Sequence, residues 1–213
     1  MPQDLISLFS ASFVTFFVLV DALGVAPVFA AMTAPGGAKY ARKMAIKSVF
    51  VATVIVFAFA FGGSWLLGQM HISLDAFRAA GGALLFLIAI DMVFEKRTER
   101  RETRAEEHMS SHEAMDDISV FPLGIPMLAG PGTIATAMLY MGNSQSVLEQ
   151  GVVLGAIALN MLICLVMFLL AGPLVRLMGE DISGGLTRIL GVILSALSIQ
   201  LLIDGIKGAF GLG

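Results

Sequence analysis

The charged residue best placed for chemistry is Asp21, which lies in the otherwise uncharged stretch of residues 5–38. A carboxylate inside such a stretch is costly, so it needs a partner, a proton or a function. Three roles are open from the sequence: a proton carrier, a ligand for a substrate ammonium group, or the N-cap of a half-helix that begins just after it. The first two roles would make Asp21 part of a binding site.

Two clusters of glycine and proline interrupt apolar segments, at residues 20–27 and 121–133. Neither cluster fits an unbroken α-helix, because proline removes a backbone donor and clashes with the preceding turn. A half-helix that starts after each break would present free N–H groups and the positive end of its dipole, which suit a carboxylate. Pro27 and Pro131 are predicted to be first-turn residues of these half-helices.

Together the two clusters predict a binding site for a small polar solute such as a neutral amino acid. A single proline more often kinks a membrane helix for packing, but two clusters in corresponding positions of two halves are typical of secondary transporters. Backbone groups at residues 24–27 and 130–133 are expected to hold the solute carboxylate, and Asp21 is expected to hold its ammonium group or a coupling proton. The predicted solute-binding residues are Asp21, Gly24, Pro27, Gly124, Pro126, Gly130, Pro131, Gly132 and Thr133.

Other catalytic or metal-binding patterns are weak. His108 and His112 have the i, i+4 spacing of metal ligands on a helix, but two ligands alone make a poor site, so no metal and no cofactor is expected. The sequence has no Gly-x-Ser-x-Gly or His-Glu-x-x-His motif, and we expect no enzymatic activity. Cys164 is the only cysteine, which excludes an internal disulfide. Asp91 and Asp204 lie near the ends of apolar stretches and are expected to be solvated.

The composition of the chain indicates a membrane protein. Hydrophobic residues make up 57% of the 213 residues and charged residues only 14%, whereas soluble domains have about a quarter charged residues. The net charge of −3 argues against nucleic acid as a partner, and the expected partners are the solute and the lipid bilayer. The first apolar run carries Asp4 where a signal peptide has basic residues, so we expect it to be a span.

Apolar stretches predict an all-α fold of six transmembrane helices. The stretches between Lys47 and His71 and between Glu149 and Arg176 contain no Lys, Arg, Asp or Glu, and each is long enough to cross a bilayer. The other four spans are interrupted by breaks or bounded by charges. They are expected within residues 5–38, 77–94, 118–148 and 186–206.

The distribution of basic residues predicts the orientation. Of the 13 Lys and Arg residues, all but Arg78 and Lys207 fall on one side of the predicted membrane, which is expected to be the cytoplasmic side. Both termini are therefore predicted to be periplasmic. The expected location is the inner membrane of a bacterium.

Two short motifs occur in both halves of the chain. Arg78-x-x-Gly81 is repeated as Arg188-x-x-Gly191, and Ala22-Leu23-Gly24 is similar to Pro122-Leu123-Gly124. Three spans per half would place the second copy upside down, which predicts two inverted three-helix repeats with helices 1 and 4 broken. The repeats are predicted at residues 1–95 and 118–213, with a charged cytoplasmic linker at 96–117. Motifs as short as these also arise by chance.

With these segments in view, the chain resembles the MarC family of integral membrane proteins, some of which are described as small neutral amino-acid transporters. The resemblance covers the six predicted spans and is carried by residues 21–29, 81–90, 122–132 and 201–206. It implies an inverted-repeat fold and movement of glycine or alanine. One departure is Ala22, where family members usually have proline, and it implies a milder first break.

The leading prediction is a secondary transporter of small neutral amino acids, proton-coupled and working by alternating access. An efflux carrier for another small metabolite is the alternative. A membrane scaffold without transport is a third, and Gly151-x-x-x-Gly155 would suit helix packing in it. A scaffold, however, has no use for two broken helices.

Overall fold

The computed structural model describes residues 2–94, 100, 103 and 117–212. This part of the chain is helical and contains no strand. Most of the predicted linker at 96–117, including His108 and His112, lies outside the described residues.

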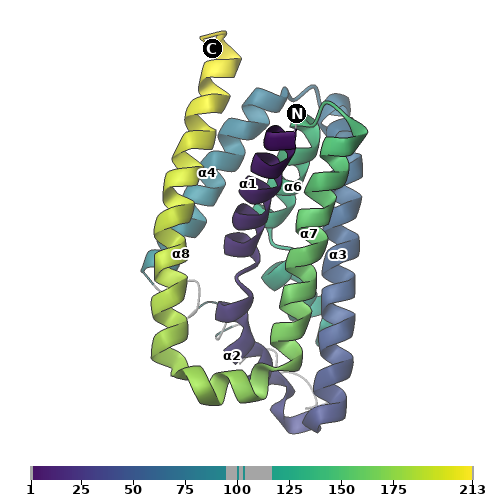
Figure 1. Cartoon of the computed structure of the whole chain (residues 1–213), viewed down its shortest axis with the longest axis vertical. Coiled ribbons are helices and arrows are strands. Elements are labelled where there is room, and N and C mark those ends of the chain that lie inside the picture. The colour runs from purple at the N-terminus through teal and green to yellow at the C-terminus, as the bar shows by residue number, and fades with distance from the viewer. Residues whose placement is uncertain (1, 95–99, 101–102, 104–116, 213) are drawn as a thin grey trace.

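The first half of the chain is a broken helix followed by two long ones. The elements are α1 (Pro2–Val20), α2 (Ala22–Thr33), the short turn η1 (Ala34–Gly36), α3 (Gly37–Gln69) and α4 (Leu74–Val93). Figure 1 shows that α1 and α2 run in the same general direction, that α3 runs back in the opposite direction and that α4 reverses again. The reversal between α2 and α3 falls at Gly37, whose φ of 68° favours glycine.

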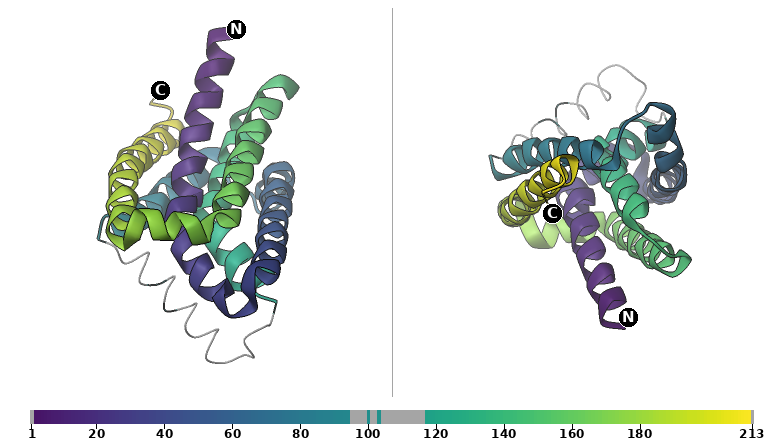
Figure 2. Two further views of the ribbon diagram at one scale, coloured as in Figure 1. Left: turned by 60° about the horizontal axis from the view of Figure 1, so that its bottom comes forward. Right: turned by 90° about the horizontal axis from the view of Figure 1, so that it is seen from above.

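The second half follows a similar course. Its elements are the irregular segment η2 (Ser119–Leu128), α6 (Pro131–Asn143), α7 (Val147–Leu169) and α8 (Ala171–Phe210). The first turns of α8 run across the ends of other helices, and its remainder turns to run alongside α4 (Figures 1 and 2). The two termini lie at the same end of the molecule.

Four helical stretches of the described chain are long and apolar enough to cross a membrane. A fifth is added if η2 and α6, which meet at a bend of 59°, form one broken span. One of the four, Asp4–Gln69, is 66 residues long and contains the reversal at η1. About 20 residues suffice to cross a bilayer, so this stretch includes more than one crossing.

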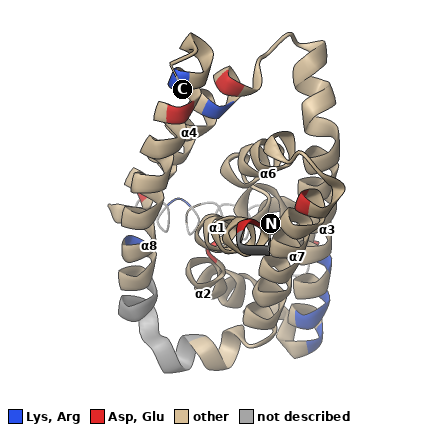
Figure 3. Cartoon of the chain, turned by 45° about the horizontal axis from the view of Figure 1, so that its top comes forward, with Lys and Arg blue, Asp and Glu red and all other residues tan. Residues whose placement is uncertain are grey.

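Large apolar side chains point outward as well as inward. Phe50, Phe61 and Trp65 on α3 are between 63% and 68% exposed, as suits a surface in contact with lipid. Lys39, Arg42 and other basic residues predicted in a loop lie instead on the first turns of α3, at the end opposite the termini (Figure 3). The protein is an integral, multi-pass membrane protein.

The packing between the halves is reciprocal. Helix α3 of the first half packs against both parts of the second broken segment, η2 and α6. Helix α7 of the second half packs against both parts of the first broken segment, α1 and α2. The most extensive contact joins α4 to α8, the last helices of the two halves.

Glycines allow the backbones of α4 and α8 to touch. A Cβ atom at Gly82 would lie 2.6 Å from the backbone nitrogen of Leu202 and 2.7 Å from the carbonyl oxygen of Ser198. In the other helix, a Cβ atom at Gly191 would lie 3.1 Å from the carbonyl oxygen of Ala89. Helices in lipid associate through small residues that let their backbones approach closely. The lipid tails are as apolar as the helices, so no hydrophobic force drives the helices together.

We expect Gly82→Val to destabilise the protein strongly, because the valine side chain would clash with the rigid backbone of α8 and not with a side chain that could move away. Overpacking of this kind costs about 3 kcal/mol or more. The thermal unfolding midpoint of the protein in detergent would measure the loss. The control is Gly62→Val in α3, where a Cβ atom meets nothing within 4 Å. Equal midpoints for the two variants would contradict the close packing of α4 on α8.

Candidate solute-binding site

Asp21 separates α1 from α2 and caps the second of them. Its φ of 49° and ψ of 53° place it in the left-handed region, which asparagine and aspartate tolerate better than most residues. The carboxylate Oδ1 accepts a hydrogen bond from the backbone N–H of Gly24 at 3.2 Å. Of the three roles that the sequence left open for Asp21, the structure shows the N-cap.

Thr187 and Gly24 are two neighbours of this cap. The hydroxyl of Thr187 on α8 donates to Asp21 Oδ1 at 3.4 Å, and the Asp21 side chain is buried. A Cβ atom at Gly24 would collide with the Asp21 carboxylate, so glycine at this position gives the capping carboxylate the space it needs. Because Asp21 starts the helix at Ala22, Pro27 lies inside α2, and the prediction that Pro27 is a first-turn residue was wrong.

The second break is longer than the first. Phe121 and Ile125 have extended backbone, as expected for residues that precede proline. Helix α6 then begins at Pro131, so the prediction that Pro131 is a first-turn residue is confirmed. Gly130 occupies the N-cap position of α6, and no side chain caps the helix there. The N-terminus of α6 thus lacks the carboxylate that α2 has.

The start of η2 is anchored by Asp117. Its carboxylate pairs with Lys47 of α3 and accepts hydrogen bonds from the hydroxyl and the backbone N–H of Ser119. The contact with Lys47, followed by those with Ser119, lowers the pKa of Asp117 from 3.8 to about 2. The anchor is therefore complete above pH 3.8 and is lost as the pH falls through about 2.

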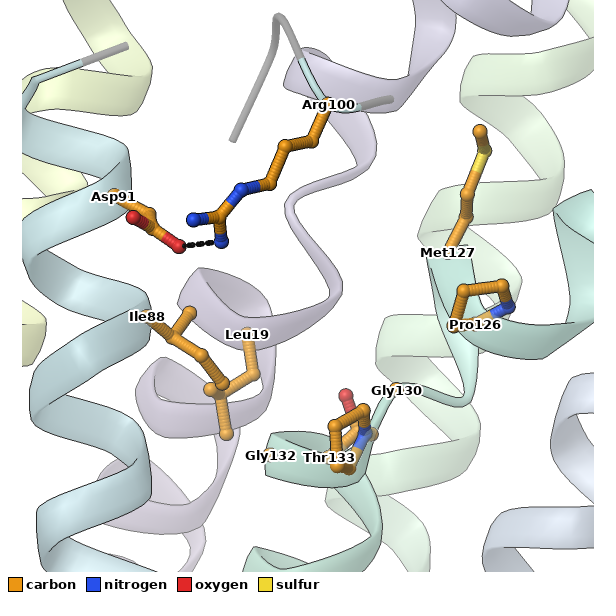
Figure 4. Close-up of a pocket in the computed structure, with 10 residues that line it drawn as sticks. Leu19, Ile88, Asp91, Arg100, Pro126, Met127, Gly130, Gly132 and Thr133 are labelled. Atoms are coloured by element: carbon orange, nitrogen blue, oxygen red, sulfur yellow. Dashed lines mark hydrogen bonds and ion pairs between the residues drawn. The ribbon is translucent and has the colours of Figure 1, made fainter. Parts of the chain in front are cut away.

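A cavity of about 270 Å³ lies where the second break faces α1 and α4. Figure 4 shows its walls, which come from α1, α4, η2, the first turn of α6 and the segment after α4. The lining residues are Leu19, Ile88, Asp91, Arg100, Pro126, Met127, Gly130, Pro131, Gly132 and Thr133.

The cavity contains part of the predicted site. Five of the nine predicted residues line it, from Pro126 at one end to Thr133 at the other. Asp21, Gly24, Pro27 and Gly124 are not among its lining residues. Gly132 leaves room for the Ile88 side chain, because a Cβ atom there would lie 2.7 Å from Ile88 Cδ1. The structure therefore gathers the second cluster at the cavity and places Asp21 at a helix cap.

The charges at the cavity come from residues that the sequence patterns did not single out for binding. Asp91, in the last turn of α4, forms an ion pair with Arg100 (Figure 4). The Asp91 side chain is 20% exposed and that of Arg100 is 62% exposed, so the cavity reaches the surface beside Arg100. Asp91 was expected only to be solvated, and its position in the cavity wall was not predicted. One signal was available: the end of a helix disfavours an acidic residue, so Asp91 called for an explanation.

The electrostatic character of the cavity follows from the helix ends. The last turn of α4 has the negative end of its dipole and the Asp91 carboxylate. The first turn of α6 has the positive end of its dipole and N–H groups at Gly132 and Thr133 that have no carbonyl partner within the helix. Leu19 and Ile88 add apolar surface. The cavity therefore offers an acidic residue that is paired with Arg100, the positive end of a helix and a small apolar surface.

No cluster of three or more His, Cys, Asp or Glu side chains suited to a metal ion occurs among the described residues.

Asp21→Ala is expected to lower stability by about 1 kcal/mol, the usual cost of losing an N-cap, while Asp21→Asn should keep the hydrogen bond to the Gly24 N–H. Thermal unfolding of the two variants in detergent would measure the difference. If Asp21→Asn proved as unstable as Asp21→Ala, a role for Asp21 beyond capping α2 would be required.

Comparison with known proteins gives one family. The family model described as MarC family integral membrane protein matches residues 6–210. A UPF0056 membrane protein of Methanocaldococcus jannaschii is 36% identical over 94% of this chain and 97% of its own length. The UPF0056 membrane protein YhcE of Escherichia coli is 34% identical over 93% of this chain and 91% of its own. No solved structure matches the chain.

Proposed function

The chain belongs to the MarC family of integral membrane proteins, and we propose that it is a secondary transporter of small neutral amino acids that works by alternating access. The observation that carries the proposal is the cavity between the last turn of α4 and the first turn of α6. A zwitterionic amino acid has an ammonium group to match Asp91 and a carboxylate to match the N-terminus of α6.

The first turn of α6 is the site that we propose for the carboxylate. Pro131 has no N–H group, so Gly132 and Thr133 supply the first backbone donors of the helix. In α2 the corresponding position is filled by the chain's own carboxylate, Asp21. Gly130 leaves that position open in α6, and an anionic group of the solute would complete the helix end in the same way.

The size of the cavity supports a small solute. At about 270 Å³ it is slightly smaller than the pockets of roughly 300 to 1,000 Å³ that hold drug-sized ligands. Leu19 and Ile88 are the apolar groups available to a side chain. Glycine and alanine are therefore the amino acids that we propose as substrates.

Two inverted three-helix repeats are the architecture that we propose for six crossings. In the first repeat α1 and α2 would form one broken span, and in the second η2 and α6 would form its counterpart. The reciprocal packing of α3 and α7 supports the repeat, because a two-fold axis in the membrane plane would exchange those contacts. One constant shift in residue number takes Asp21 to Gly130, Gly82 to Gly191 and Ala89 to Ser198. This pairing differs from the motif alignment of Gly24 with Gly124, and it places the two breaks in register.

The proposed orientation puts the basic first turns of α3 in the cytoplasm and both termini in the periplasm of a bacterial inner membrane. The retention of Lys and Arg on the cytoplasmic side supports it. Arg100 would then lie at the cytoplasmic mouth of the cavity. Catalysis has no part in the proposal, and no cofactor or metal ion is included.

Asp91→Asn should weaken transport of glycine and alanine, because it removes the negative charge that faces the ammonium group. Loss of a charge-assisted hydrogen bond is worth roughly tenfold to a hundredfold in apparent KM. Uptake of radiolabelled glycine into proteoliposomes would measure it. Asp204→Asn, at the end of another helix and away from the cavity, is the control. An unchanged KM in Asp91→Asn would remove the ammonium site from the proposal, and no flux through the wild-type protein would overturn the substrate class.

Asp21 is the group that we propose for proton coupling, since it is a buried carboxylate at the junction of α1, α2 and α8. Asp21→Asn should remove the dependence of glycine uptake on an imposed pH gradient, because asparagine keeps the cap but does not titrate. Uptake with and without the gradient would test this at matched expression. Gradient dependence equal to that of the wild type would show that Asp21 acts only as a cap.

A further inference from the structure

Helix α6 has a row of hydroxyl groups that begins at the cavity, with Thr133 and Thr136 buried and Tyr140 half-buried. Thr133 lines the cavity, and Thr136 and Tyr140 follow it at spacings of three and four residues, which place all three on one face of the helix. The Tyr140 hydroxyl lies 3.1 Å from Oγ1 of Thr15, so this face is turned toward α1. The row therefore leads from the cavity along the contact between α6 and α1.

Thr136 is the exceptional member of the row. Its side chain is 1% exposed, and its hydroxyl has no hydrogen-bond partner among the described residues. Several other buried hydroxyls bond to the carbonyl of the preceding helical turn, as Thr15 does to Ala11 at 2.7 Å and Thr33 does to Phe29 at 2.8 Å. A buried polar group without a partner is unfavourable, so its presence in an apolar segment calls for a partner in another state.

Beyond Thr136, toward the end of the molecule that holds the termini, further contacts join α1 to α6. The Thr15 hydroxyl meets that of Tyr140, and the rings of Phe16 and Tyr140 pack with their centres 6.0 Å apart. These contacts involve one hydrogen bond and one ring pair between α1 and α6. Tilting of the helices could break both without unfolding either helix.

We propose that the seam between α1 and α6, defined by Thr15, Phe16, Thr133, Thr136 and Tyr140, is the route by which the solute passes between the cavity and the side of the chain termini. The inference rests on the proposed transport function. In the state described here the seam is closed. When it opens, the Thr136 hydroxyl bonds to the passing solute or to the water that accompanies it, which explains why it lacks a protein partner.

Cysteine labelling tests the route without reference to transport. Thr136→Cys in a Cys164→Ala background should react with a small charged methanethiosulfonate reagent added on the side of the termini, and glycine should change the rate. The wild-type chain is the control, because Cys164 is fully buried outside the seam and should stay unlabelled. A cysteine at position 136 that remains unlabelled with and without glycine would overturn the route.

Transport tests the role of the hydroxyl. Thr136→Val keeps the shape of the side chain and should slow glycine turnover about tenfold, while Thr136→Ser should preserve it. Glycine binding, measured by thermal shift, should be unchanged because Thr136 does not line the cavity. Thr53→Val is the control, since the Thr53 hydroxyl already bonds to the Val49 carbonyl. Wild-type turnover in Thr136→Val would overturn this role.

The two inferences can fail separately. If the wild-type protein moves no small amino acid, the proposed function fails, and the labelling alone decides whether the seam opens. If the wild type transports glycine but neither Thr136→Cys nor Thr136→Val behaves as expected, the cavity remains the proposed binding site. The seam is then no longer the proposed route.

Discussion

Inside a bilayer no water is available to a backbone N–H or C=O group, so every interruption of a helix must be satisfied by protein or by a bound molecule. Both broken segments of this chain face that constraint. At the first break Asp21 meets this requirement, because its carboxylate accepts a hydrogen bond from the Gly24 N–H. Glycine at position 24 leaves the space that this carboxylate occupies. The first break is therefore a closed structural joint.

The second break meets the same constraint differently. Proline residues extend the backbone before α6, glycine takes the N-cap position, and no side chain of the described residues donates or accepts a capping hydrogen bond there. The free end instead borders a cavity with an acidic residue in another wall. The difference between Asp21 at the N-cap of α2 and Gly130 at the N-cap of α6 is what separates a structural joint from a candidate binding site.

Local features of this chain could be predicted from the sequence, and long-range ones could not. The apolar stretches, the N-cap at Asp21 and the start of a helix at Pro131 depend on residues within a few positions of each other. Pro27 was misplaced because a cap five or six residues earlier started the helix sooner. Asp91 was missed because its importance depends on α4 ending beside the start of α6, and no periodicity in either segment encodes that meeting.

The direct backbone contact between α4 and α8 limits how this protein can move. With glycine at positions 82 and 191, the backbones of the two helices approach each other closely at these two points. The axes cannot approach further, and separating them would expose polar backbone to the membrane interior. A change of shape that keeps these contacts can therefore turn the two helices only about the points where their backbones touch. The glycines that appear to be simple packing residues thus limit how the last helices of the two halves can move against each other.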